Sequence, residues 1–472
     1  MNELLEMTAT ELVGRMTAGE LSSRELTQAH LEQIEAVNPA LNAIVTLDPE
    51  RALQAARDAD EALPATGPLG PLHGLPMTHK DSHMVAGMRS TQGSPIFAEH
   101  VPDADDRLIA RLRRAGVVAT GKSNIPEFAA GSHTFNEVFG TTVNPYDTGV
   151  SAGGSSGGVA AAIASRIQPL GDGSDMGGSL RIPASFCNVY GFRPSYGVIP
   201  TFPPQNPQAW LARGGPMART VADLELFMRA VSGPVPELPS VRALDAEEFG
   251  ARPAESLSGV RIAVTKDFGQ GVPVDPEMLA AVDRAAETLA GLGASVEEAT
   301  IDFSGADEVF HVTRAFDFAT TLGPLVEQHR DRIKPEVIWN VEEGLRLDAA
   351  RLIRANELYA ALQEAVRDFF SGYDLLLAPG SQVLPFDASL RYPAEVAGVP
   401  CETYLDWMRA ACLLSATGLP VLAMPAGFSA SGLPTGVQLA GPHGSDPALL
   451  RWARRYDEAT GWPSEKPGIL KS

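Results

Sequence analysis

The chain has 472 residues, 44% of them hydrophobic, so it can bury a large core, and its length allows one large domain or two to three small ones. Its formal net charge of −21 is spread without a long acidic run, which disfavours nucleic acid and anionic membrane surfaces as partners. The three cysteines, Cys187, Cys401 and Cys412, show no metal or redox spacing, so a reducing cytoplasm is the expected compartment.

The N-terminal region, residues 3–62, is predicted to be helical, and it lacks the basic start and apolar core of a signal peptide. Thr8 and Glu11 have the spacing of a capping box. Further on, short apolar pieces alternate with glycine and proline turns, followed by a predicted helix over 105–115 and a strand over 117–120. Strands that alternate with helices predict an α/β layer architecture.

Lys80 stands out because the chain has only six lysines among its 37 basic residues and this one lies between apolar segments. A solvated loop lysine is the usual alternative. Burial would depress the pKa of the amine toward neutrality. His79 and His83 flank Lys80 at a spacing that could place two imidazoles on one helical face for a metal. Nearby proline and glycine leave little room for a helix, so we interpret both as loop histidines.

Residues 116–123 satisfy the phosphate-loop pattern G-x4-G-K-S letter for letter. The context argues against it, because an apolar VVAT occupies the supposed loop and Pro126 follows soon after. We interpret 117–120 as a strand and 121–124 as its exit.

The stretch from Gly153 to Ala184 carries two glycine-serine clusters, 153–158 and 177–179, on either side of a small-residue run predicted to form a short helix. Glycine lets backbone approach a ligand closely, so two such clusters suggest two backbone cradles at one site. A flexible linker is the common alternative for this composition. The adjoining apolar segments, with Asp175 and Arg181, are not expected in a linker.

The first cluster also fits G-x-S-x-G, the nucleophile elbow of α/β-hydrolases. That alternative makes the protein an esterase with Ser155 as nucleophile and a downstream histidine, for which His443 is the candidate. It leaves the second glycine cluster and Lys80 unexplained, and the segment before the motif has the pattern of a turn rather than a strand.

The C-terminal half predicts a helix capped by Thr220 and then a βαβ unit, with strands at 260–264 and around Val296. Residues 305–372 are predicted to be mainly helical. Buried strands are predicted over 373–379 and 419–425, and a hairpin over 427–437.

The whole Gly153–Ala184 stretch resembles the signature of the amidase signature family of serine hydrolases. The resemblance continues through 121–128, 190–195 and 215–223, and again near the C-terminus, and it is poor between about 300 and 410. It implies one α/β domain over 1–472 with a mixed sheet sandwiched between helices. Within that domain we expect three parts: an N-terminal helical segment (1–62), a signature core (65–235) and a variable substrate-side region (300–410).

The resemblance also implies a Ser-cisSer-Lys triad, with Ser179 as nucleophile, Ser155 as bridging serine on a cis Gly154–Ser155 bond, and Lys80 as base. A neutral lysine can activate a serine hydroxyl through a second serine, which then protonates the leaving nitrogen. The expected oxyanion hole consists of the backbone N–H groups of Met176, Gly177, Gly178 and Ser179. Asp175 and Arg181 are expected to support this loop. Ser156 is expected either to hydrogen-bond Lys80 or to cap a helix.

The expected activity is hydrolysis of a non-peptide carboxylic amide through an acyl-enzyme, without metal or cofactor. Aryl or alkyl amides, carbamates and oligoamides all remain open as substrates. The expected partner is this small-molecule amide, with no nucleic acid and no membrane, and a homodimer stays open.

A tRNA-linked role is disfavoured because the glycine- and tyrosine-rich segment of the family's transamidation subunit is not found at 340–365. A scaffold that binds without catalysing is the non-enzymatic alternative. Scattered aromatic residues could line an apolar substrate pocket or pack in the core: Phe202, Trp210, Phe316, Trp339, Tyr404 and Trp407.

Overall fold

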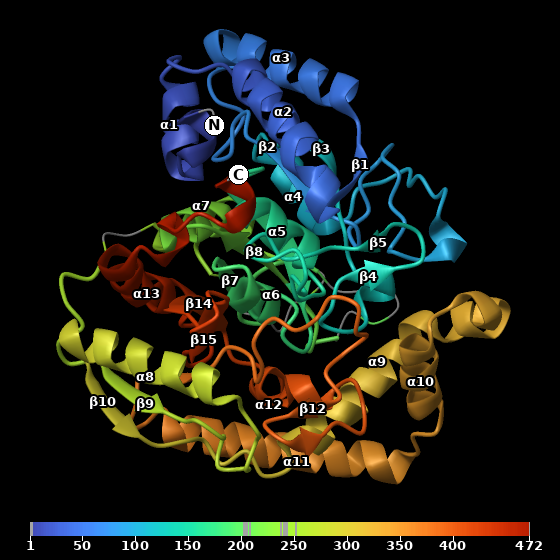
Figure 1. The fold of residues 1–472 in the computed structure, drawn as a ribbon, viewed down its shortest axis with the longest axis vertical. Coiled ribbons are helices and arrows are strands. Elements are labelled where there is room, and N and C mark those ends of the chain that lie inside the picture. Colours follow the sequence, from blue (N-terminus) through green and yellow to red (C-terminus); the bar gives the residue numbers. More distant parts are fainter. Residues whose placement is uncertain are drawn as a thin grey trace.

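The helices of the chain pack against two β-sheets, one of eight strands and one of three (Figure 1). This computed structural model describes residues 3–201, 206, 209–236, 238, 244–250 and 253–471. The larger sheet is mixed, as expected, because β10, β9 and β11 run parallel and the following strands pair antiparallel. In sheet order its strands are β10 (Ser295–Glu298), β9 (Arg261–Val264), β11 (Leu375–Pro379), β15 (Pro434–Ala440), β14 (Val421–Phe428), β7 (Tyr190–Arg193), β8 (Arg213–Ala218) and β6 (Leu170–Asp175).

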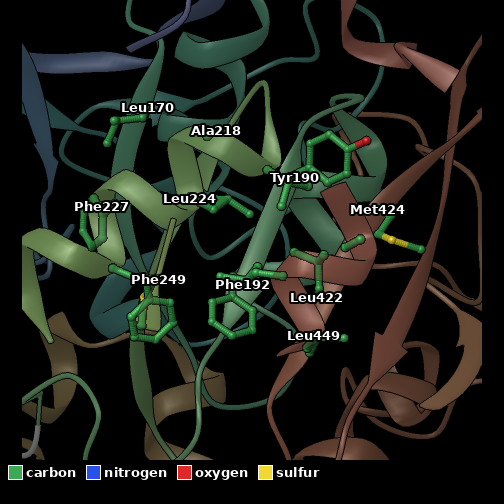
Figure 2. Packing of buried hydrophobic residues seen from close by; sticks show 14 of the residues in the cluster. Leu170, Tyr190, Phe192, Ala218, Leu224, Phe227, Phe249, Leu422, Met424 and Leu449 are labelled. Carbon is green, nitrogen blue, oxygen red and sulfur yellow. The ribbon is translucent and has the colours of Figure 1, made fainter. Parts of the chain in front are cut away.

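Helices cover both faces of this sheet because side chains alternate along its apolar strands. In β14, Leu422 and Met424 belong to one core cluster, whereas Val421 and Ala423 belong to the clusters on the opposite face. Figure 2 shows Leu422 and Met424 packed with Leu449 and with strand and helix residues of the first cluster. That cluster includes residues of α7 (Val221–Val231), α8 (Pro276–Gly291) and α13 (Asp446–Thr460). The opposite face is covered by α5 (Gly157–Ala164), α6 (Arg181–Phe186) and α12 (Arg409–Ala416).

The three-stranded sheet has the order β1-β3-β2, with β1 antiparallel and β2 parallel to β3. Its strands are β1 (Ile44–Leu47), β2 (Pro76–Lys80) and β3 (Val118–Ser123). Around it, at the top of Figure 1, lie α2 (Ser23–Leu41) and α3 (Pro49–Thr66), with α1 (Ala9–Thr17) and α4 (Arg107–Arg114) nearby. The capping box of Thr8 and Glu11 is confirmed at the start of α1.

Two sequence expectations about this region need correction. The N-terminal 60 residues are not helical throughout, because Asn42 takes a left-handed conformation that ends α2 and the next residues pair with β3 as β1. The strand expected at 117–120 runs on to Ser123, so the G-K-S letters of the phosphate-loop pattern lie within β3. Gly121 fits there because an added Cβ would lie 2.1 Å from the carbonyl oxygen of Thr46 on β1.

The C-terminal half follows its predicted pattern. The βαβ unit is β9, α8 and the parallel strand β10, and the predicted hairpin is formed by β14 and β15. The helical stretch consists of α9 (Ala306–His329), α10 (Pro335–Leu345) and α11 (Ala349–Phe369). Short two-stranded sheets are formed by β4 (Phe135–Asn136) with β5 (Gly140–Thr141), and by β12 (Glu395–Val396) with β13 (Val399–Pro400). Among the described residues, no helix combines the length and apolarity that a membrane span needs.

Leu422→Ala is expected to lower the free energy of unfolding by about 2–5 kcal/mol, because Leu422 is fully buried in β14 and its truncation leaves a cavity. Leu345→Ala is the control, since Leu345 is 71% exposed at the end of α10 and should change stability by less than about 0.5 kcal/mol. Urea unfolding followed by circular dichroism measures both. Equal midpoints for the two variants would contradict the described core.

Candidate active site

Lys80, the last residue of β2, is fully buried, and its amine is surrounded by serine hydroxyls. Its Nζ donates to Ser155 Oγ at 2.7 Å, to Ser174 Oγ at 2.8 Å and to Ser156 Oγ at 3.0 Å. In the described part of the chain, neither of the nearby carboxylates, those of Asp172 and Asp175, forms an ion pair with this amine. The lysine therefore meets neutral hydroxyls where a surface lysine would meet water.

Burial lowers the pKa of Lys80 to about 7, while the negative charges of Asp175 and Asp172 act in the opposite direction. Desolvation has the larger effect on this pKa, because the charged amine loses its water and gains no direct carboxylate contact. Near neutral pH a large fraction of Lys80 is therefore an uncharged amine, the form that accepts a proton.

Asp172 on β6 fixes where β2 ends. Its Oδ2 accepts the backbone N–H of Lys80 at 3.1 Å, and its Oδ1 lies 2.7 Å from His79 Nδ1. Asp172 and Ser174 are two residues apart on one strand, so both point to the face that meets β2. Neither residue was predicted from the sequence to belong to the site, although the alternation within LGDGSD places both on one face of the strand.

The two serines before α5 lie against Lys80 and the second glycine cluster. The Gly154–Ser155 peptide bond is cis, the geometry that the family resemblance implies. Ser156 N–H donates to the carbonyl oxygen of Ser179 at 3.1 Å, which joins the two clusters directly. The Ser156 side chain makes no cap to α5 and instead accepts from Lys80, so of its two expected roles the contact with lysine is the one found.

Residues 176–179 form a tight loop between β6 and α6. Gly178 has a φ of +106°, and an added Cβ would lie 2.7 Å from Ala411 Cβ on α12. A Cβ at Gly177 would lie 2.9 Å from the Phe310 ring on α9. Glycine is required here because helices pack directly against the loop. This close packing leaves Ser179 only 7% exposed.

Asp175 and Arg181 brace this loop from inside. Arg181 donates through Nε and Nη2 to the two carboxylate oxygens of Asp175, at 3.0 and 2.9 Å, and both side chains are buried. Arg193 adds a second guanidinium 3.5 Å from the same carboxylate. These cations hold the pKa of Asp175 far below its usual range although burial acts against it. The supporting contacts expected for the first pair are therefore present, and Arg193 is an unexpected third member.

The expected oxyanion groups do not behave alike. The Gly178 N–H donates to Asp175 Oδ1 at 3.0 Å, so it serves to hold the loop. Within the described residues, the N–H groups of Met176, Gly177 and Ser179 meet no protein acceptor. Three backbone donors are thus left for a ligand, rather than the four that the resemblance implies.

A cavity of about 600 Å³ opens beside the loop and includes Ser174 and Met176 in its wall. Its apolar lining is formed mainly by Phe97, Phe128, Phe318, Leu322 and Leu325. Of the aromatic residues considered from sequence, Phe202 lies outside the described residues. The other five do not line this cavity: Trp407 is buried against Phe186, and Trp210 stacks on Tyr359. Single aromatic positions in the sequence did not indicate which rings face the site.

The two histidines beside Lys80 do not share a helical face. His79 lies in β2, so its interpretation as a loop residue is wrong, whereas His83 lies in the turn that follows. The nucleophile-elbow arrangement is also not formed. Ser155 Oγ is hydrogen-bonded to Lys80, whereas His443 Nε2 is hydrogen-bonded to Gln363 Oε1 at 2.9 Å, so this serine and histidine do not pair.

The sequence model of the family described as Amidase matches residues 25–450. The acylamidase of Rhodococcus erythropolis is 34% identical over 466 residues, which cover 98% of this chain and 97% of that protein. A subunit of the glutamyl-tRNA(Gln) amidotransferase of Burkholderia mallei strain SAVP1 is 33% identical and covers 97% of this chain and 98% of its own length.

Solved structures resemble this chain over nearly its whole length. A bacterial aryl acylamidase of the amidase signature family gives a TM-score of 0.90 at 26% identity, covering 99% of this chain and 100% of the other. A 6-aminohexanoate cyclic dimer hydrolase complexed with its substrate gives a TM-score of 0.85 at 26% identity, covering 99% of each chain. The mixed sheet and its flanking helices are therefore those of amidase signature enzymes.

Asp175→Asn is expected to destabilise the fold by about 3–5 kcal/mol, because it leaves the buried guanidinium of Arg181 without its charge partner. Asp368→Asn is the control, since Asp368 and Arg367 form an ion pair with both side chains 70% exposed, which contributes at most about 1 kcal/mol. Urea unfolding compares them. A loss below about 1 kcal/mol for Asp175→Asn would contradict the bracing role.

Proposed function

The chain is an amidase that belongs to the amidase family, and we propose that it cleaves its small-molecule amide through an acyl-enzyme on Ser179. The observation that carries this proposal is the buried Lys80 amine, which contacts Ser155 at 2.7 Å and has a pKa near 7. A serine hydroxyl becomes a useful nucleophile only when a neighbouring base takes its proton.

In the proposed first step, Ser179 Oγ attacks the amide carbonyl while its proton passes to Ser155, whose own proton passes to neutral Lys80. Two features support this relay. Ser155 is fully buried and hydrogen-bonded to Lys80, and the adjacent Ser156 N–H is bonded to the Ser179 carbonyl. The two serines thus belong to segments joined by their backbones, which favours proton transfer between positioned groups.

The carbonyl oxygen becomes negatively charged as the tetrahedral intermediate forms. We place it against the N–H groups of Met176, Gly177 and Ser179, which have no protein acceptor among the described residues. One such donor typically stabilises the transition state by about 3 kcal/mol. The Asp175–Arg181 pair and the Gly178 N–H hold the loop in place for this purpose.

Collapse of the intermediate expels the amine. Lys80, now protonated, returns its proton through Ser155 to the leaving nitrogen, because an amine leaves poorly as an anion. Water then attacks the acyl-enzyme by the same relay and releases the carboxylate and Ser179. Apart from the substrate and water, these steps use only side chains and backbone of the chain, so the proposal assigns no metal and no cofactor.

For the substrate we propose a linear aryl or alkyl amide, since an acylamidase and an aryl acylamidase are among the similar proteins and the cavity is mainly apolar. The similarity to one component of an amidotransferase also allows a role within a larger complex. Hydrolysis by the isolated chain separates these two interpretations of the same site. We further propose that the enzyme is cytoplasmic. It is either a monomer or a homodimer, and analytical ultracentrifugation distinguishes the two.

Ser179→Ala and Lys80→Met are each expected to lower kcat for a p-nitroanilide by about 1,000-fold or more, because nucleophile and base act as one unit. Lys266→Met is the control, since Lys266 lies in a surface ion pair with Asp283 and should leave kcat unchanged. Release of p-nitroaniline at pH 8 measures all three. Near-normal activity in either site variant, with the control also active, would refute the proposed roles.

The pH dependence follows from the lowered pKa of Lys80. The base must be neutral, so kcat/KM should rise with pH through a midpoint near 7 and fall about tenfold per unit at lower pH. A rate profile from pH 5 to 9, with the anilide at concentrations far below KM, measures this. An optimum on the acid side of the midpoint would contradict a lysine base.

A further inference from the structure

The wall of the large cavity carries a carboxylate that is only half satisfied. Asp317 lies on α9, lines the cavity and is 5% exposed. Its Oδ1 accepts from Asn206 Nδ2 at 3.0 Å. Its Oδ2 is buried and receives no hydrogen bond from the residues that the structure describes. A buried carboxylate oxygen without a donor is costly, so such atoms are expected to have a function or a missing partner.

The cations near Asp317 do not supply that donor. Arg314 attracts the carboxylate through its charge, but its guanidinium donates to Asn340, Met176 and Tyr404. Arg213 lines the same cavity, and its guanidinium donates to backbone carbonyls of Trp210, Pro194 and Gly418.

Asp317 Oδ2 is therefore a buried acceptor that lacks a donor among the described residues. The negative charge of this carboxylate decides which ligand charge the site favours. A cationic donor would supply the missing hydrogen bond to Asp317 Oδ2, whereas an anionic ligand would leave that oxygen without a donor and be repelled by its charge.

The rest of the wall specifies what accompanies such a donor. Phe318 and Leu322 follow Asp317 on α9, and Phe128 and Met176 line the same cavity, so the space between Asp317 and the loop beside Ser179 is mainly apolar. A ligand that fits both features has an apolar chain or ring with a positively charged nitrogen beyond it.

We propose that Asp317 is a specificity-determining residue that binds a protonated amine on the substrate, at the far end of an apolar segment from the scissile amide. The inference rests on the proposed function of the neighbouring site. The substrate class is then an amide with an ω-amino group, held by a charge-assisted hydrogen bond to Oδ2. Burial raises the pKa of Asp317 to about 6, so at pH 8 the carboxylate is ionised while Lys80 is neutral.

The test compares pairs of amides that differ only in a terminal amine. One series carries it at the end of the acyl chain and the other at the end of the leaving amine, each beside the methyl-terminated amide of equal length. The wild type is expected to favour the amine-bearing member of one series by about 10- to 100-fold in kcat/KM at pH 8. Absence of any such preference in both series would overturn the proposal.

Asp317→Asn is the decisive variant, because its amide oxygen can still accept from Asn206 while Oδ2 is replaced by an NH2 group. It should lower kcat/KM for the amine-bearing amide far more than for its methyl-terminated match, so that the preference is lost. Glu327→Gln removes one charge from an exposed position of the same helix and should retain the preference. Equal losses on both members of a pair would mean that Asp317 only supports the fold, and would refute the proposal.

Direct binding keeps the question separate from catalysis. Calorimetric titration of hexylammonium, with hexan-1-ol as the uncharged match, needs a folded cavity but no turnover. Hexylammonium should bind the wild type at least about tenfold more tightly than hexan-1-ol, and Asp317→Asn should remove the difference. If the amides are not hydrolysed, the catalytic proposal fails while this titration still decides the role of Asp317. Equal affinities in the wild type would overturn it.

Discussion

The burial of one lysine amine among three serine hydroxyls is the constraint on which the rest of the site depends. Lys80 ends a strand of the small sheet, whereas its hydroxyl partners come from the edge strand β6 and the turn before α5. The amine can lose its water only if these parts of the fold close around it, and Asp172 anchors that junction through the Lys80 backbone. A lysine pKa near neutrality is therefore a property of the tertiary fold rather than of the local sequence.

A second buried charge system holds the loop that faces the amine. Asp175 accepts from Arg181 and from the backbone of the loop itself, and Arg193 lies against it. Removing the charge of Asp175 would leave two buried guanidinium groups without their charge partner, so the arrangement holds the loop rigidly. Rigidity suits the role proposed for the remaining N–H groups of this loop, because donors that are already in position need not reorganise around a developing negative charge.

Local patterns in the sequence predicted much of the fold and part of the candidate site. Caps, alternating apolar strands and the βαβ unit each depend on neighbours a few residues apart, and they indicated the mixed α/β sheet. Ser155 and Ser179 were predicted from a dense motif, and Lys80 from its apolar neighbours, the scarcity of lysines and the family resemblance. Ser174 and Asp172 were missed although strand alternation places both opposite Lys80. Asp317 carried no local signal, since its unpaired oxygen is visible only when α9 is packed beside the cavity. The strand β1 was missed because pairing with β3 overrides a helical context.

The central claim is that Lys80 activates Ser179. It is tested most directly by treating the protein with a fluorophosphonate probe and locating the adduct by peptide mass spectrometry, for the wild type beside Lys80→Ala. We expect the adduct on Ser179, formed far more slowly in the lysine variant, because the probe reacts with an activated serine. An adduct on Ser155 that forms equally fast in both proteins would contradict the account and favour the nucleophile-elbow alternative.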